Sequence, residues 1–201
     1  MKMIISTVVI LFFFQQNQPP VVKITMPKSG DALSVGAPLR YSISVSDKED
    51  GDTKYEEINT NEILLTVKLN GAKAGDRSVL HAMMTSNCMN CHAFTTKLIG
   101  PSFQEISEKK SNAAELSKHV KLGSTGVWGQ IVMPSHPELD DDEIGKMVEW
   151  ILKFKTQQNT QYYLGKEGAV KLANAGAVTL TASYLDHNKT LGEDVVAVQV
   201  K

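Results

Sequence analysis

The apolar residues of this chain change their spacing twice, and that change limits the folds it can adopt. In "PLRYSISVSD" and "NEILLTVKLN" they alternate with polar residues, which is the pattern of half-buried strands. From about Asp76 to Lys155 the spacing becomes helical, and alternation returns in "AVTLTASYLD" and "VVAVQVK". The sequence therefore predicts a mixed α+β protein in which an all-α unit lies between two strand-forming segments.

The two strand-forming segments, residues 19–72 and 160–201, are expected to build one small β-sandwich. Pro, Gly and Asp in "MPKSGD", "SVGAP" and "SDKEDGD" supply the turns that antiparallel sheets require. The strands expected near the C-terminus are too few to form a domain alone, because an isolated hairpin is only marginally stable. We therefore expect them to pair with the N-terminal strands, with the helical unit of residues 76–155 inserted between. Two separate small β modules are the alternative.

Composition places the chain among ordinary globular proteins and argues against one class of partner. Of its 201 residues, 42% are hydrophobic and 21% charged, and the formal net charge is -1. Such a balance offers no basic surface to neutralise phosphates, so we expect no nucleic-acid binding.

Residues 1–16 have the composition of an export signal. Lys2 precedes an apolar run from Met3 to Phe14, and Gln, Asn and Pro follow. A twelve-residue helix rises only about 18 Å, short of the roughly 30 Å of a hydrocarbon core. A signal peptide is therefore expected, with a buried first strand as the alternative. Because the segment lacks a small-residue cleavage site, a short uncleaved anchor also stays open. We expect an exported, periplasmic protein that associates with a membrane only if this segment is retained.

The only two cysteines lie in "SNCMNCHAF", with His92 directly after Cys91. A redox dithiol of the thioredoxin kind follows a strand, whereas the preceding "SVLHAMMTSN" predicts a helix that ends before Cys88. A four-ligand zinc site would need a second pair, and no further cysteine exists. Cys-x-x-Cys-His is the sequence in which both thiols bind the vinyl groups of haem and the histidine ligates iron. We therefore expect one covalently attached haem c.

The sixth iron ligand decides between electron transfer and substrate chemistry. Met133 lies 42 residues after Cys91, far enough for two helices and a loop to surround the haem, and Pro134 stiffens the chain behind it. Core filling is the commoner role of methionine, and Met83, Met84, Met89 and Met147 are expected to do that. Met133 is the expected ligand because it sits in a loop bounded by Gly and Pro. The rival ligands are His136, His119 and His81.

Two further stretches of the helical unit agree with a haem protein. Asp140 or Asp141 caps a closing helix whose apolar face contains Ile144, Met147, Val148, Ile151 and Leu152. In "KLIGPSFQEI", Gly100 and Pro101 precede a helix with Phe103 and Ile106 turned inward. A carbonyl beside that proline would accept the Nδ1 proton of His92 and fix its tautomer.

"SNCMNCHAF", "KLIGPSFQEI" and "VMPSHPELDDDEIGKMVEWIL" together resemble a small class I bacterial cytochrome c, over the 80 residues from Asp76 to Lys155. The resemblance implies that Cys88 and Cys91 form the thioethers and that His92 and Met133 are the axial ligands. It also implies that Pro101 is the partner of His92 and that Trp128 contacts a haem propionate. The segment from Gln18 to Asp52 resembles an immunoglobulin-like, PKD-type module of the kind fused to such cytochromes.

The resemblance implies a function. We expect a monohaem electron carrier, not an enzyme, that passes single electrons between redox proteins. The donor is expected to be a dehydrogenase, for instance a sugar dehydrogenase, and the acceptor an oxidase or another cytochrome. Two alternatives stay open: a haem sensor or peroxidase-like enzyme with an open sixth position, and a carbohydrate- or protein-binding β module that carries an accessory cytochrome.

The acidic stretch "SDKEDGDTKYEE" partly fits a calcium loop. Asp50, Gly51 and Glu57 occupy the fifth, sixth and twelfth positions, but Ser46 and Lys48 stand where the first and third ligands belong. We expect a solvated turn here.

Overall fold

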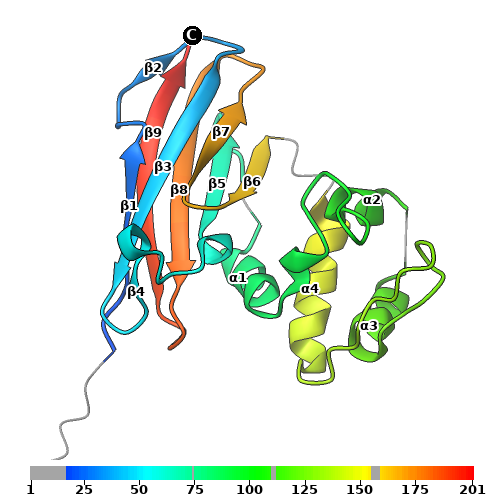
Figure 1. The fold of residues 1–201 in the computed structure, drawn as a ribbon. Coiled ribbons are helices and arrows are strands. Elements are labelled where there is room, and N and C mark those ends of the chain that lie inside the picture. Colours follow the sequence, from blue (N-terminus) through cyan, green and yellow to red (C-terminus); the bar gives the residue numbers. More distant parts are fainter. Residues whose placement is uncertain (1–16, 74, 110–111, 155–158) are drawn as a thin grey trace, which may run out of the picture.

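A computed structural model describes residues 17–73, 75–109, 112–154 and 159–201. It consists of a β part and a helical part that lie side by side (Figure 1). The mixed α and β class predicted from the sequence is confirmed. The segment expected to be a signal peptide or anchor, residues 1–16, lies outside the described residues. No helix in the described ranges is long and apolar enough to cross a membrane.

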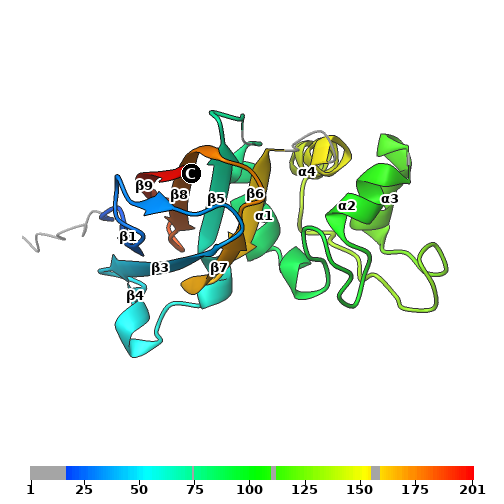
Figure 2. The ribbon, with the colours of Figure 1, turned by 90° about the horizontal axis from the view of Figure 1, so that it is seen from above.

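The β part contains two sheets that pack face to face (Figure 2). In the four-stranded sheet, β3 pairs with each of the other strands, all antiparallel. Its members are β1 (Val21–Met26), β3 (Pro38–Asp47), β4 (Gly51–Asp52) and β7 (Glu167–Lys171). The five-stranded sheet has the order β2, β9, β8, β5, β6, and only β2 with β9 is parallel. Its members are β2 (Ala32–Leu33), β5 (Leu64–Leu69), β6 (Thr160–Leu164), β8 (Gly176–Leu185) and β9 (Leu191–Val200).

Strands from before and after the helical part pair within both sheets. In the five-stranded sheet β5 lies between β8 and β6, and in the other sheet β3 pairs with β7. One hydrophobic core lies between the sheets and draws buried residues from both ends of the chain, among them Leu39, Val45, Val178 and Leu180. The apolar alternation therefore has its expected physical origin, since one face of each strand points into this core.

The strands predicted around residues 39–45, 63–69, 178–184 and 196–200 are confirmed as β3, β5, β8 and β9. The expectation of two strands after the helical part was wrong, because that segment also forms β6 and β7. These two strands are five residues each, and β7 buries only Val170. A strand with one buried side chain leaves no alternation to detect.

In the described residues of the helical part there are four α-helices with well-formed N-termini. They are α1 (Arg77–Thr85), α2 (Phe103–Glu108), α3 (Ala113–Leu122) and α4 (Asp141–Lys153). Asp140 caps α4 in a capping box with Glu143, which confirms the predicted start of the closing helix. The expected core methionines Met83, Met84, Met89 and Met147 are all buried.

The acidic segment expected to be a solvated turn has protein partners. The Asp50 carboxylate accepts hydrogen bonds from the Tyr184 hydroxyl at 2.8 Å and from the His187 main-chain N–H at 3.0 Å. Glu57 accepts one from the Asp52 N–H at 3.0 Å. These two carboxylates tie the segment after β3 to itself and to the end of β8.

The helical part occupies the connection between β5 and β6, two adjacent strands, and packs against them. Leu64 of β5 and Tyr162 of β6 belong to the same hydrophobic cluster as Leu80, Met147 and Trp150. The helical core is therefore completed by side chains from the five-stranded sheet.

Polar contacts fix α1 to the same sheet. His81, 2% exposed, makes a 2.9 Å hydrogen bond through Nε2 with the Ser183 hydroxyl of β8. Arg77 forms an ion pair with Glu193 of β9 at 2.6 Å. The two parts of the chain therefore share one continuous interface.

Candidate functional site

The Cys-x-x-Cys-His segment forms a tight turn at the end of α1. Asn87 takes the left-handed conformation with φ 61°, and the 3₁₀ turn η3 (Cys88–Asn90) follows. The Cys88 carbonyl accepts from the N–H groups of Cys91 at 3.2 Å and His92 at 3.0 Å. Both thiols and the imidazole therefore leave a single turn, as attachment to one macrocycle requires.

A main-chain carbonyl holds the His92 imidazole. Its Nδ1 lies 2.6 Å from the Pro101 carbonyl oxygen, which can only accept, so Nδ1 carries the proton. In the neutral ring the Nε2 lone pair is then available to a metal. Burial lowers the pKa of His92, outweighing the opposite effect of the bond to Pro101, so the neutral form prevails at neutral pH. The pairing expected from the Gly-Pro motif is thus present.

Two neighbours pack against the faces and edge of this imidazole. The Phe103 ring stacks on it, with centroids 5.6 Å apart and an interplanar angle of 18°. A Cβ at Gly100 would lie 2.6 Å from the imidazole Cε1 atom, closer than van der Waals contact allows. Glycine is therefore required beside the ring.

The cysteines are poorly suited to dithiol redox chemistry. Burial, with smaller contributions from Cys91 and Glu138, raises the pKa of the Cys88 thiol to about 11, whereas a reactive cysteine needs a lowered one. The preceding element is helix α1 rather than a strand. Among the residues that the structure describes, no group of three or more His, Cys, Asp and Glu side chains could hold a metal ion.

Met133 lies in the loop between α3 and α4, where main-chain bonds fix its position. It forms an isolated antiparallel bridge with Ser124, with N···O distances of 2.9 and 3.0 Å. Gly123 has φ +77°, and a Cβ there would lie 2.8 Å from the Met133 carbonyl oxygen. The loop that carries Met133 therefore depends on glycine at position 123 for two separate reasons.

The rival histidines have protein partners. His136 contacts Glu138 at 2.9 Å, and His119 lies 3.9 Å from Glu115. His81 is buried against the β part. These contacts favour Met133 as the second candidate ligand.

Trp128 packs against the edge of the helical core, and the Lys109 ammonium lies 4.1 Å from its ring centroid. The Lys109 Nζ also donates to the Val127 carbonyl at 3.2 Å. The side chain expected to contact a propionate is thus paired with a cation, which an anionic group nearby would also attract.

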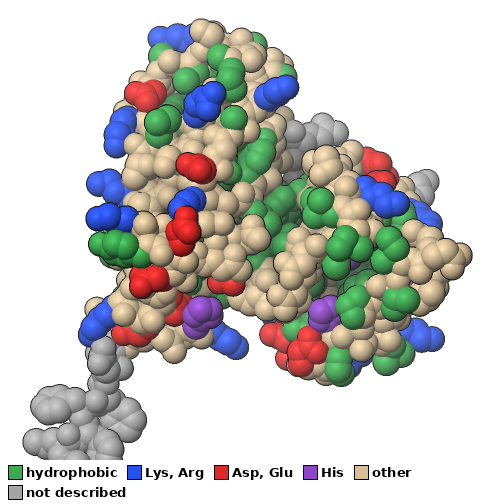
Figure 3. Space-filling view, in the orientation of Figure 1, with side chains coloured by type: hydrophobic (Ala, Val, Ile, Leu, Met, Phe, Trp, Pro, Cys, Tyr) green, Lys and Arg blue, Asp and Glu red, His purple; other side chains and the backbone are tan. Residues whose placement is uncertain are grey.

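The residues present fit a haem. Large apolar side chains are more than half exposed in the loops that follow His92 and precede Met133, and at the end of α3. They are Leu98 (53%), Ile99 (51%), Leu122 (66%), Ile131 (59%) and Val132 (62%). Apolar side chains also gather over the visible face of the helical part (Figure 3). A flat apolar macrocycle lying between these loops would cover surface that is otherwise costly to expose.

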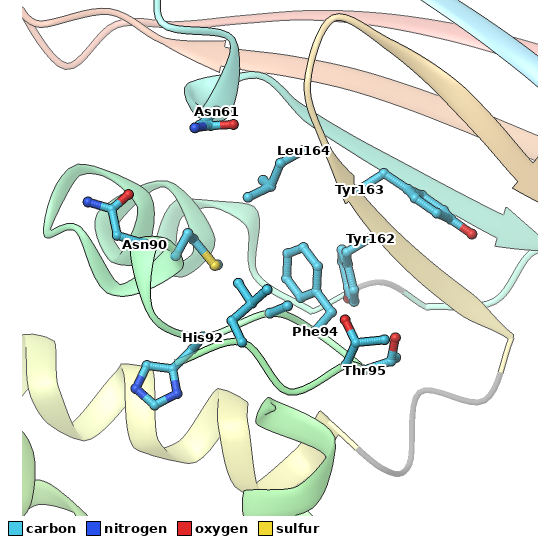
Figure 4. A pocket seen from close by; sticks show the side chains of 12 residues that line it. Asn61, Asn90, His92, Phe94, Thr95, Tyr162, Tyr163 and Leu164 are labelled. Atoms are coloured by element: carbon cyan, nitrogen blue, oxygen red, sulfur yellow. The ribbon is translucent and has the colours of Figure 1, made fainter. Parts of the chain in front are cut away.

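A cavity adjoins the attachment segment. It has a volume of about 600 Å³ and is lined by that segment, by β6 and by Asn61 of the 3₁₀ turn η2 (Thr60–Glu62). The His92 ring points away from Asn61 and Leu164, while Phe94 and Tyr162 lie next to each other (Figure 4). His92 is itself one of the lining residues, so this cavity borders the attachment site.

Sequence reasoning missed the stacking of Phe103 on His92 and the bridge between Ser124 and Met133. The apolar periodicity did place Phe103 inside the helical part, where it is 2% exposed. Spacing alone does not say which neighbour a buried ring will face. The glycine at position 123 was the available signal for a constrained loop.

Comparison with known proteins relates the helical part to c-type cytochromes. The family model for cytochrome c oxidase, cbb3-type, subunit III, matches residues 78–151. Cytochrome c-551 of Pseudomonas aeruginosa is 37% identical over 94 residues, covering 45% of this chain and 88% of that protein. Cytochrome c-552 of Nitrosomonas europaea is 40% identical over 74 residues, covering 35% and 72%. The crystal structure of wild-type Nitrosomonas europaea cytochrome c552 aligns over 39% of this chain and 99% of that one, with 35% identity and a TM-score of 0.36.

The helical part is thus a c-type cytochrome unit, and through it the chain belongs to the class I monohaem cytochromes c. Members of this family carry a covalently attached haem c and transfer electrons. The Cys88–His92 segment lies within the matched residues and is the corresponding attachment motif.

Proposed function

We propose that this chain is a one-electron carrier whose haem is held by six residues of the helical part. Cys88 and Cys91 form the thioether bonds, and His92 Nε2 and the Met133 thioether sulfur are the axial ligands. Pro101 orients His92, and Trp128 lies beside a propionate. The observation that carries the proposal is the bond from His92 Nδ1 to the Pro101 carbonyl, because it leaves Nε2 as the metal-binding atom.

The bound haem supplies an iron centre that exchanges one electron between its ferrous and ferric states. The protein's part is to hold two ligands in fixed positions, so that little rearrangement accompanies the change in charge. His92 is fixed by Pro101 and Phe103, and the Met133 main chain by Ser124. A thioether is a soft donor that favours ferrous iron, so Met133 raises the reduction potential above that of a bis-histidine haem.

The partners of this carrier are redox proteins. We infer a dehydrogenase as electron donor and an oxidase or a second cytochrome as acceptor, with the exposed edge of the haem as the docking face. The apolar character of residues 1–16 supports export to the periplasm. The two packed antiparallel sheets support an immunoglobulin-like module that acts as a spacer or docking unit.

Covalent attachment is tested by acid–acetone extraction of protein matured with a bacterial haem-attachment system. We expect the haem to stay with the polypeptide, and to be lost from a variant with Cys88→Ala and Cys91→Ala. Haem that extracts freely from the wild type would overturn the attachment site.

The sixth ligand is tested by Met133→Ala, with His136→Ala as the matched control in the same loop. The wild type should show the weak red-edge absorbance band of thioether-ligated ferric haem and should not bind carbon monoxide readily. Met133→Ala should lose the band, lower the potential and bind carbon monoxide, while His136→Ala changes none of these. If the wild type binds carbon monoxide tightly, an open site and hence the sensor or enzyme function is favoured instead.

A further inference from the structure

We propose that strand β6 of the β part positions the axial imidazole through a file of packed aromatic rings. The file runs from Tyr162 to Trp150, then to Phe103 and finally to His92, and Phe94 packs beside it against the first three rings. The inference rests on the proposed role of His92 as an iron ligand and adds a function for the β part. It makes Tyr162 a positioning residue three ring contacts from the ligand atom.

The three contacts are close and differ in geometry. Phe103 stacks on His92 with centroids 5.6 Å apart. Trp150 meets Phe103 edge to face at 5.9 Å and 88°. Tyr162 meets Trp150 at 5.5 Å and 64°. All three distances lie in the range of attractive aromatic pairs, so each ring constrains the next.

Burial makes this file rigid. Phe103 is 2% exposed, and Trp150 and Tyr162 are each 5% exposed, so none of them can turn into solvent. Among the described residues the indole Nε1 of Trp150 is buried with no hydrogen-bond partner. Ring packing therefore fixes the orientation of the indole. Close-packed interiors transmit small displacements instead of absorbing them.

Tyr162 is anchored at both ends of its side chain. Its main chain pairs with Thr66 in the ladder between β6 and β5, and its hydroxyl accepts from the Gly75 N–H at 2.9 Å. The neighbouring Tyr163 points away from Phe94 and Tyr162 (Figure 4) and packs with Tyr41 in the core between the sheets. Strand β6 therefore carries Tyr162 inside the file and Tyr163 outside it, which makes the two tyrosines a matched pair for substitution.

The property that the file is proposed to fix is the orientation of the His92 imidazole plane. Pro101 fixes the position of Nδ1, but a ring bonded at one atom can still tilt and rotate. Phe103 restricts that rotation by lying nearly parallel to the imidazole, and Trp150 and Tyr162 hold Phe103 in place. In low-spin ferric haem the imidazole plane sets the distribution of the unpaired electron, which magnetic spectra report directly.

The test compares haem-loaded Tyr162→Leu with Tyr163→Leu, a matched substitution on the same strand. Electron paramagnetic resonance gives the g values of the ferric haem, and proton NMR gives the hyperfine shifts of its methyl groups. We expect Tyr162→Leu to shift the g values and change the spread of the methyl shifts, while Tyr163→Leu keeps the wild-type spectra. Tyr162→Phe keeps the ring and should also keep them.

The variant Leu64→Ala is the control for a general loss of stability. It weakens the same hydrophobic core without removing a ring from the file. Magnetic spectra that change equally in Leu64→Ala and Tyr162→Leu, or in neither, would overturn the proposal. If Tyr162→Leu does not fold, Tyr162→Met also removes the ring while filling more of its volume, and it must give the same shift. A different result would contradict the proposed function itself. If His92 is not an iron ligand, His92→Ala should leave the magnetic spectra of the haem as they are in the wild type.

Discussion

The Nδ1 atom of His92 lies 2.6 Å from the carbonyl oxygen of Pro101, nine positions further along the chain. This contact joins the attachment turn to the start of α2, and Gly100 passes directly beside the imidazole. Because the acceptor belongs to the main chain, the orientation of the ring depends on the path of the backbone. Substitutions that move this path should therefore disturb the iron ligand.

Gly100→Ala should displace the imidazole, because the new Cβ would lie 2.6 Å from Cε1. Overpacking of this kind costs typically about 1–3 kcal/mol. Denaturant unfolding of the haem-loaded protein measures the loss. The control is Gly145→Ala in α4, where a Cβ meets no atom within 4 Å and helix propensity predicts a gain of about 0.5–1 kcal/mol. Equal stability of the two variants would contradict this account of Gly100.

Gly123→Ala should loosen the loop that carries Met133. The position has φ +77°, and the new Cβ would lie 2.8 Å from the Met133 carbonyl oxygen. Gly126→Ala is the matched control, because that glycine has φ +83° but no atom within 4 Å of a new Cβ. Both variants place a Cβ on a residue with positive φ, a strain of about 1–3 kcal/mol. Only Gly123→Ala should also increase carbon monoxide binding to the ferrous haem, and an equal increase in Gly126→Ala would assign the effect to strain alone.

His81 should make the interface between the two parts sensitive to acid. Burial, with a smaller contribution from Arg77, lowers the pKa of His81 from 6.5 to about 4. Between these two values the unfolded chain binds a proton that the folded chain does not, so this contribution to the free energy of unfolding falls as the pH falls. The loss reaches about 3 kcal/mol by pH 4.

Denaturant unfolding of wild type and His81→Gln at several pH values measures this effect. Glutamine can keep a hydrogen bond to Ser183 but does not titrate. The wild type should lose more stability than the variant on acidification through this range. The same pH dependence in both proteins would show that protonation of His81 is not linked to folding.

Haem should matter most for α3. This helix has no fully buried residue, whereas α1 and α4 contribute Leu80, Met147 and Trp150 to the core that includes Leu64 and Tyr162. In the Cys88→Ala and Cys91→Ala protein we expect hydrogen exchange to become fastest in α3 and to stay slow in β8. Protection of α3 equal to that of the haem-loaded protein would show that the polypeptide orders this helix without haem.

Apolar periodicity was enough to predict the helices and the long strands, since each buries one face. It was less informative for β5, where Leu64, Leu65, Thr66 and Val67 are all buried. One face of β5 points into the core between the sheets, and Leu64 on the other face meets the helical part. The helical part thus buries the outer face of β5. Because that burial comes from a unit inserted between β5 and β6, apolar alternation along β5 could not reveal it.

The candidate site was predicted more completely than the fold around it. Covalent chemistry restricts Cys88, Cys91 and His92 to one short motif, and such motifs are visible in sequence. The orientation of Phe103 against His92 depends on a side-chain rotamer and on two ring neighbours, Phe94 from the attachment loop and Trp150 from α4. No spacing rule specifies such an arrangement.

The helical part leaves the β part after β5 and returns at β6, and the ladder between these strands pairs Lys68 with Thr160. A tight turn could join the same two ends without changing the order of any strand. Insertions are best tolerated at such surface connections. A gene for this β part could therefore gain, lose or exchange its electron-carrying cassette at one hairpin, and engineers could graft other cofactor domains into the same position.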